Sequence, residues 1–135
     1  MQSRWPAPLI GVIAAGGAAG TLLRAFVAEH LPHPAAGFPW ATFWVNVAGC
    51  ALLGFVAVAA VERFAESSYL RPLLGTGLCG GLTTFSTWVV EVDLLVKGGH
   101  IGMAGLYTTV SVAAGLVAVR LGMVTARATW GTVSG

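Results

Sequence analysis

Groups that could bind an ion are concentrated within otherwise apolar stretches of this chain. The third of four long apolar runs is interrupted at residues 80–88, which read GGLTTFSTW. Two adjacent glycines weaken a helix, because each costs about 1 kcal/mol relative to alanine, and threonine hydroxyls can bond to the backbone groups that a break releases. Irregular backbone at membrane depth is tolerated only where protein buries it or where it lines a wet cavity. The segment therefore predicts a broken helix at an ion or solute site.

A second set of hydrogen-bonding groups lies in the second apolar run. Thr42 and Asn46 are four residues apart, so they share one face of a helix. An asparagine in a membrane helix can hold two helices together. Its two N–H groups can instead coordinate an anion directly. Both interpretations of Asn46 are open at this point.

Aromatic and hydroxyl side chains continue the polar pattern. Phe85 and Trp88 are three residues apart, and Tyr107 and Ser111 in the fourth run are four apart, so each pair shares a helix face. Aromatic rings carry a weakly positive edge that could face an anion. Rings at this spacing also pack commonly in a core or against lipid, and hydroxyls in a helix can bond to the preceding turn.

Few ionisable residues lie within the apolar runs. Arg24 comes late in the first run, where its side chain could reach the membrane surface or supply positive potential beside an anion entrance. Glu91, near the end of the third run, could face a vestibule. His30 and His33 lie at the first connection. Histidines in interfacial loops are far commoner than histidines that bind a metal, so we assign these two no role.

Composition identifies the class of protein that must position these groups. The chain has 135 residues, of which 56% are hydrophobic and 9% are charged, whereas a soluble domain carries roughly 25% charged residues. We therefore expect a multi-pass protein of the cell membrane. Because a span needs roughly 20 apolar residues, the chain is predicted to be one all-α domain, residues 1–135, with spans at about 8–31, 40–61, 70–96 and 101–119. The net charge of +2 is too small to suggest nucleic-acid binding.

Three motifs, taken together, resemble those of the Fluc (CrcB) fluoride channels. They are GGxxGxxxR at residues 16–24, TxxxNxxG at residues 42–49 and GGLTTFST at residues 80–87. The third motif is highly specific, whereas the other two would be weak alone. The similarity covers nearly the whole chain in the expected order and spacing. It implies passive export of fluoride, which lowers the fluoride concentration in the cytoplasm.

The resemblance also implies an assembly and a cofactor. Members of this family form dual-topology dimers, in which two subunits insert in opposite orientations and pack antiparallel. Two narrow fluoride pathways and a central sodium ion are expected. By this resemblance, the sodium ligands are backbone carbonyls within the break, which correspond here to Gly80 and Thr83.

The expected fluoride pathway follows from the same resemblance. The pore asparagine corresponds to Asn46, the first pore phenylalanine to Phe85, and the polar track to Tyr107 and Ser111 facing Thr42. Fluoride is strongly hydrated, so donors must replace its water without binding it too tightly for release. Trp88 stands where the family typically has a second phenylalanine, which adds an N–H donor and a larger ring.

Basic residues give conflicting information about the partner subunit. Two basic residues, Arg24 and Lys97, are expected on one side of the membrane, and the other side carries Arg4, Arg63, Arg71, Arg120 and Arg127. Five against two favours one orientation under the positive-inside rule, whereas a dual-topology homodimer should be nearly balanced. We favour the homodimer, with an oppositely oriented partner chain as the alternative.

Two rival functions are disfavoured by the residues. A small dual-topology multidrug exchanger requires an acidic residue deep in its first helix, but the first run has no carboxylate before Glu29. An intramembrane hydrolase would need a base, and no histidine lies deep inside a span to activate Ser86 or Ser111, since His30 is at the very end of the first span. The chain is therefore not expected to be an enzyme.

Overall fold

The computed structural model describes residues 6–31, 35–64 and 67–130, and this part of the chain forms helices joined by short connections. The elements are α1 (Ala7–His30), α2 (Trp40–Glu62), η1 (Arg71–Cys79), α3 (Gly80–Leu82), α4 (Phe85–Lys97) and α5 (Ile101–Trp130). Because η1, α3 and α4 follow one another in a single pass, the described residues contain four helical passes that are long and apolar enough to cross a membrane. The predicted all-α membrane fold is confirmed.

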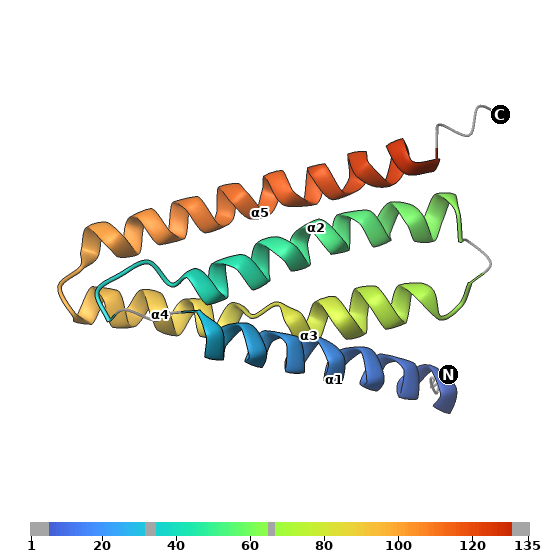
Figure 1. Cartoon of the computed structure of the whole chain (residues 1–135), viewed down its shortest axis with the longest axis horizontal. Coiled ribbons are helices and arrows are strands. Elements are labelled where there is room, and N and C mark those ends of the chain that lie inside the picture. Colours follow the sequence, from blue (N-terminus) through green and yellow to red (C-terminus); the bar gives the residue numbers. More distant parts are fainter. Residues whose placement is uncertain (1–5, 32–34, 65–66, 131–135) are drawn as a thin grey trace, which may run out of the picture.

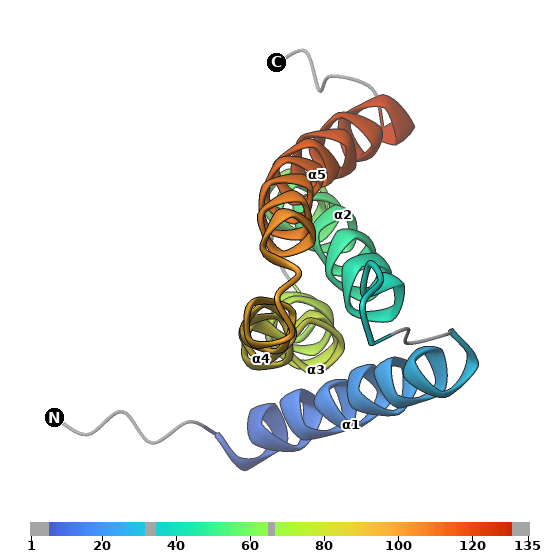
Figure 2. The same cartoon turned by 90° about the vertical axis from the view of Figure 1, so that its left-hand side faces the viewer.

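The passes lie side by side, and neighbours in sequence run in opposite directions (Figure 1). Seen along the bundle, α5 and α2 form one pair, and the third pass lies between α2 and α1 (Figure 2). α2 packs along α5, while α1 packs along η1 and α3. The third pass is therefore held by both α1 and α2.

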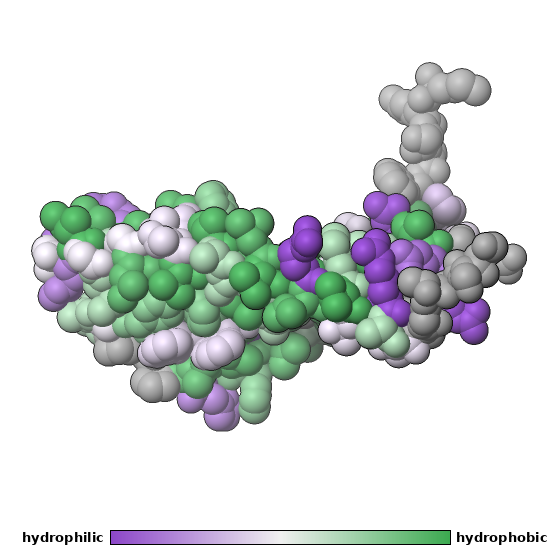
Figure 3. All heavy atoms as spheres, turned by 90° about the horizontal axis from the view of Figure 1, so that it is seen from above, coloured by the Kyte–Doolittle hydropathy of each residue, from purple (hydrophilic) through white to green (hydrophobic). Residues whose placement is uncertain are grey.

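The last helix extends further than the sequence predicts. α5 continues to Trp130, whereas the predicted span ends near residue 119. Its continuation packs closely on α2. The two backbones approach so closely that a Cβ atom at Gly122 would overlap the carbonyl of Ala51. Arg127 Nε also bonds to Glu62 Oε1 at 3.2 Å. Apolar groups cover much of the α5 face of the molecule, and hydrophilic groups gather toward its ends (Figure 3).

Glycines on α1 and on the third pass allow their backbones to touch. Gly16 and Gly20 are buried in α1, and a Cβ atom at Gly20 would lie 2.7 Å from the backbone nitrogen of Leu82. On the other side, a Cβ atom at Gly77 would lie 2.7 Å from the carbonyl oxygen of Ile13. Gly16 and Gly20, four residues apart, therefore form a close-packing surface of the GxxxG type.

The third pass is broken, but not at its glycines. The helix runs through Gly80 and Gly81 and ends at Leu82, and Thr83 and Thr84 are extended, with ψ angles of 154° and 122°. Gly81 is instead required for packing, because a Cβ atom there would overlap the carbonyl of Gly17. The predicted break is confirmed, and its position shifts from the two glycines to the two threonines.

Candidate functional site

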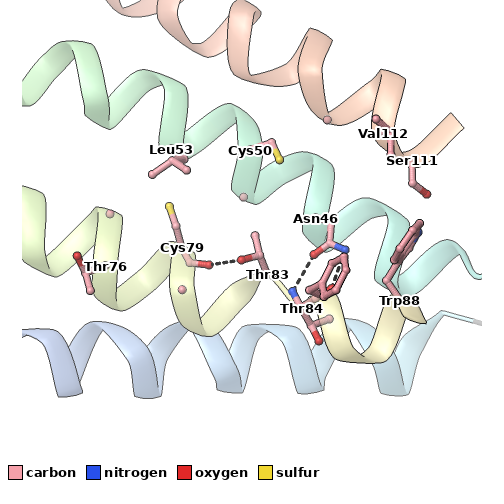
Figure 4. A pocket seen from close by; sticks show the side chains of 15 residues that line it. Asn46, Cys50, Leu53, Thr76, Cys79, Thr83, Thr84, Trp88, Ser111 and Val112 are labelled. Carbon is pink, nitrogen blue, oxygen red and sulfur yellow. Dashed lines mark hydrogen bonds between the residues drawn. The ribbon is translucent and has the colours of Figure 1, made fainter. Parts of the chain in front are cut away.

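Asn46 holds the break through both halves of its side-chain amide. Thr84 N–H donates to Asn46 Oδ1 at 2.8 Å, and Asn46 Nδ2 donates to the carbonyl of Thr84 at 3.0 Å (Figure 4). The amide thus pairs with the Thr84 N–H, which the interruption separates from the preceding turn, and with the carbonyl of the same residue at the N-cap of α4. One of the two Nδ2 hydrogens is used in this contact, so a second remains available as a donor.

The hydroxyls of the two threonines finish the helices on either side of the break. Thr83 Oγ1 and Thr83 N–H both donate to the carbonyl of Cys79, at 2.8 Å and 2.9 Å. Thr84 is the N-cap of α4, because its Oγ1 accepts from the backbone N–H of Thr87 at 3.2 Å. The predicted use of threonine hydroxyls at freed backbone groups is confirmed.

Arg24 contacts the break rather than the membrane surface. Its Nη1 donates to the carbonyl of Thr83 at 3.4 Å, and the residue is half-buried. The interpretation that Arg24 extends to the interface is therefore wrong, since the side chain turns inward toward the third pass. Arg24 also lines a cavity of about 440 Å³ together with Thr42, Thr84, Thr87 and Glu91.

A second cavity, of about 460 Å³, lies on the other side of the break. It brings together most residues predicted for the fluoride pathway and both predicted sodium ligands: Asn46, Gly80, Thr83, Phe85, Trp88 and Ser111. The Phe85 side chain is 76% exposed and its ring stacks on Trp88 at a centroid distance of 5.5 Å. The sequence spacing of these two rings thus predicts their contact correctly.

Two donors beside this cavity are buried without a hydrogen-bond partner in the described chain, Trp88 Nε1 and Ser111 Oγ. Figure 4 shows the two side chains next to each other, from α4 and α5. A buried donor without a partner costs about 1–3 kcal/mol. Buried donors of this kind typically mark places where a ligand or a water molecule accepts the missing hydrogen bond.

Thr42 and Tyr107 lie apart from this cavity and use their hydroxyls differently. Thr42 Oγ1 donates to Glu91 Oε1, and Tyr107 Oη donates to Glu91 Oε2, each at 2.7 Å. All three residues are buried, Glu91 with only 7% of its surface exposed. The ring of Tyr107 lies 6.3 Å from that of Trp88 and so connects this cluster to the cavity.

The importance of Glu91 is underestimated from sequence. It is predicted there only as a vestibule charge, whereas the structure makes it the acceptor that joins α2, α4 and α5. A usable signal exists, because Glu91 is three residues after Trp88 and therefore on the same helix face.

The histidines do not form a metal centre with other ligands in the described ranges. Among these residues, no group of three or more His, Cys, Asp or Glu side chains is placed to hold a metal ion. His30 Nδ1 donates to the carbonyl of Phe26 at 2.8 Å. His33 lies outside the described residues.

Comparison with known proteins identifies a family and several relatives. Residues 11–123 match the family described as "CrcB-like protein, Camphor Resistance (CrcB)". The chain is 50% identical to "Fluoride-specific ion channel FluC 1" of Mycobacterium bovis over 87% of this chain and 89% of that protein. It is 43% identical to "Fluoride-specific ion channel FluC" of Prosthecochloris aestuarii, over 94% of this chain and 98% of that protein.

Proposed function

This chain belongs to the CrcB family, and from that membership we propose that it forms a fluoride-selective channel through which the anion leaves the cell passively. Its relatives over most of its length carry the name of fluoride-specific ion channels. The observation that carries the proposal is the cavity beside the break, where an exposed aromatic ring lies among amide, indole and hydroxyl groups. A channel performs no covalent chemistry, so an enzymatic role is not proposed.

The cavity suits a small anion that must exchange water for protein donors. Asn46 has one Nδ2 hydrogen left after its contact with Thr84, and Phe85 offers a positive ring edge. Trp88 Nε1 and Ser111 Oγ are further donors without partners in the described chain. Weak contacts of this kind allow an anion to leave as readily as it enters, which conduction requires.

In this proposal, Thr42 and Tyr107 lie on the approach to the pathway rather than in the cavity beside the break. Their hydroxyls already donate to Glu91, so an anion on this route would have to compete with a buried carboxylate for the same hydrogens. Arg24 lines the adjoining cavity and supplies positive potential there. We propose that this side forms an approach to the pathway and that the Glu91 cluster positions α5 beside it.

The break can also contribute sodium ligands, with one difference between the two expected carbonyls. In an unbroken helix Thr84 N–H would bond to the carbonyl of Gly80, but here it bonds to Asn46 Oδ1. The Gly80 carbonyl therefore lacks the helical hydrogen bond from Thr84. The Thr83 carbonyl accepts a long bond of 3.4 Å from Arg24 and retains a second lone pair. Unwound carbonyls of this kind bind sodium in other membrane proteins, so both residues fit a structural sodium ion.

A second subunit is needed to complete this site. Gly80 is exposed, and apart from its sequence neighbours and its own helix backbone no atom of the described chain lies within 4 Å of the position that its Cβ would occupy. Because the Gly80 carbonyl lacks its helical bond from Thr84 and unpaired backbone groups are not tolerated against lipid, we propose that another protein chain covers this side of the break. We propose an antiparallel arrangement in which two such breaks meet at the sodium ion.

The proposed function is tested by measuring fluoride release from liposomes. The purified chain is reconstituted into liposomes loaded with fluoride, and a fluoride electrode follows release with and without an imposed proton gradient. Release that persists without the gradient, and that is much slower for chloride, is expected. Strict dependence on the proton gradient would indicate an exchanger, and no release above that of empty liposomes would refute the proposal.

A further inference from the structure

An exposed arginine lies within the apolar part of the last helix. The predicted fourth span ends just before Arg120, but α5 continues to Trp130. On the neighbouring helix, a Cβ atom at Gly54 would overlap the carbonyl of Val119, so Arg120 lies beside the middle of α2. Glu62, where α2 ends, is eight residues beyond Gly54, which is about 12 Å along the helix axis. The backbone of Arg120 is therefore well inside the apolar part of the bundle.

The Arg120 side chain points away from the rest of the bundle. The face of α5 that packs on α2 is buried and includes Ala118 and Gly122. Arg120 is two residues from each of them, which places it on the opposite face of the helix. That face is apolar and exposed, because Leu116 and Val124, one turn before and one turn after Arg120, are 66% and 58% exposed. Since α5 also lies at the edge of the bundle (Figure 2), this face meets lipid.

The charge of Arg120 has no partner in the chain. Arg120 makes no hydrogen bond or ion pair with any residue of the described ranges, whereas charged side chains within membrane spans are almost always paired. A long side chain can extend to the membrane surface. However, Cα–Cβ bonds tilt toward the N-terminus of a helix, which for this half of α5 is away from the nearer surface. The guanidinium therefore needs an acceptor that comes from outside the chain and reaches below the surface.

The phosphate of a membrane lipid has the chemistry that this arginine lacks. A guanidinium presents a planar fork of donors that matches two oxygens of one phosphate. Arg127 lies two turns further along the same face of α5, and its Nε bonds to Glu62 Oε1 at 3.2 Å. That bond holds the end of α5 against α2 and keeps a second cation toward the head groups. Basic side chains near the surface attract anionic lipids, so the two arginines favour a negatively charged head group.

This face of α5 is separate from the fluoride site. Ser111 and Gly115 line the cavity beside the break, and a Cβ atom at Gly115 would lie 3.5 Å from Cys50 Sγ on α2. Ser111 and Gly115 therefore point toward α2, whereas Arg120 points away from it. A protein chain that covers the break does not need to cover Arg120.

We propose that Arg120 binds the phosphate of a membrane phospholipid on the outer face of α5, and that anionic lipids such as phosphatidylglycerol bind there more tightly than zwitterionic ones. A zwitterionic lipid carries its own ammonium group, which competes with the arginine for the phosphate, and an anionic lipid lacks that competitor. The site goes beyond the proposed function, because Arg120 lines neither cavity and lipid binding is measured without fluoride.

Native mass spectrometry of the purified chain tests this site. The protein in detergent is mixed with phosphatidylglycerol, or with phosphatidylcholine of the same acyl chains, and the lipid-bound fraction is measured over a range of lipid concentrations. Arg120→Gln should weaken phosphatidylglycerol binding by about tenfold or more, because it removes charge-assisted hydrogen bonds. Arg71→Gln is the matched control, since Arg71 is also exposed but begins η1 on another pass. Salt screens such a charge, so the control should change the affinity by no more than about twofold.

Several outcomes would overturn the lipid site. Unchanged binding by Arg120→Gln, or equal weakening by Arg120→Gln and Arg71→Gln, would show that the lipid follows only the general positive charge of the chain. Equal affinities for the two lipids would contradict the anionic preference. Displacement of the lipid by inorganic phosphate would indicate a site for free phosphate instead. The number of subunits in the complex should be the same for Arg120→Gln, and its dissociation would show that a carboxylate of another protein chain pairs with Arg120.

Thermal unfolding gives a second measurement that also reports whether the variant is folded. Without added lipid, Arg120→Gln should unfold at the temperature of the natural chain, because Arg120 has no partner in the described residues. Added phosphatidylglycerol should raise the unfolding temperature of the natural chain by mass action and raise that of Arg120→Gln less. Arg120→Lys keeps the charge but lacks the planar fork, so its stabilisation by phosphatidylglycerol should be intermediate. Equal stabilisation of all three proteins would overturn the proposal.

Discussion

Asn46 and Thr84, 38 residues apart in the chain, are joined by two hydrogen bonds that run in opposite directions. Asn46 Oδ1 accepts from the Thr84 N–H at 2.8 Å, and Asn46 Nδ2 donates to the Thr84 carbonyl at 3.0 Å. The amide oxygen therefore replaces the helical acceptor that the Thr84 N–H lacks. Asn46, for which helix linkage and anion binding were both open interpretations, therefore links α2 to the break, and its substitution is expected to affect stability as well as transport.

Asn46→Asp is expected to abolish fluoride release and to destabilise the fold. Aspartate keeps an acceptor for the Thr84 N–H but loses the donor to the Thr84 carbonyl and places a negative charge beside the pathway. Loss of this bond with a buried group costs roughly 1–3 kcal/mol, measurable by thermal unfolding in detergent. Asn46→Ala is the control that removes the bonds without adding charge, and it should retain more flux than Asn46→Asp. Undiminished release by Asn46→Asp would exclude Asn46 from the pathway.

Phe85→Ile should slow fluoride release while leaving the fold intact. Isoleucine is apolar but has no positive ring edge, and a contact worth about 0.5–1.5 kcal/mol corresponds to a rate change of about two- to tenfold. Phe26→Ile is the matched control, because Phe26 is also exposed, at 58%, but lies on α1 away from the cavity. Leu53 would be a poor control since it lines the same cavity as Phe85. Equal rates of fluoride release for Phe85→Ile and Phe26→Ile would show that Phe85 serves packing rather than contact with the anion.

The helical passes are predictable because composition and run length alone require them, but the position of the break is not. Gly80 and Gly81 look like the weak point of the helix, yet both remain helical. Gly81 serves the contact with Gly17, and such a contact depends on how α1 crosses the third pass. Thr83 is then the first residue to leave the helix, and other helices supply bonds there, from Arg24 to Thr83 and from Asn46 to Thr84.

The chemistry of the site is partly predictable for a similar reason. Residue types and same-face spacing correctly associate Phe85 with Trp88. Residue types and spacing do not show that the hydroxyls of Thr42 and Tyr107 donate to Glu91, because these contacts form only where three different helices meet. Spacing within one helix predicts which side chains share a face, whereas the partner across the interface is decided by packing.

Tyr107→Phe is expected to weaken the contact between α4 and α5. The Tyr107 hydroxyl donates to Glu91 Oε2 at 2.7 Å in a buried position, and a typical hydrogen bond contributes about 0.5–1.5 kcal/mol to stability. Its loss should lower the free energy of unfolding by about that amount. The chain contains one other tyrosine, Tyr69, which is 49% exposed, so Tyr69→Phe is a matched control with little expected effect. Equal unfolding temperatures for the two variants would contradict this role of Glu91.

Sodium removal should reduce fluoride flux if the carbonyls of Gly80 and Thr83 bind that ion. The protein is purified and reconstituted with a large organic cation in place of sodium, and release is measured before and after sodium is restored. A fall in rate that sodium reverses, and that potassium does not, is expected because the break would lose its bound charge. Rates of fluoride release that do not depend on sodium would contradict the proposed sodium site. Arg24→Gln offers a second readout, because losing the guanidinium beside Thr83 should increase the sodium affinity.

Gly20→Ala should disrupt the packing that holds the third pass against α1. A Cβ atom there would lie 2.7 Å from the Leu82 nitrogen and overlap the Leu78 carbonyl, and backbone atoms cannot move aside as a flexible side chain can. Overpacking of this kind typically costs about 1–3 kcal/mol, and the displaced α3 would carry the break with it, so fluoride release should fall together with stability. Gly105→Ala is the matched control in α5, where no atom lies within 4 Å of the added methyl group, and it should be neutral or stabilising by up to about 1 kcal/mol through helix propensity. Thermal unfolding and fluoride release measured on both variants check this, and normal behaviour of Gly20→Ala would mean that α1 and the third pass do not approach as closely as the structure shows.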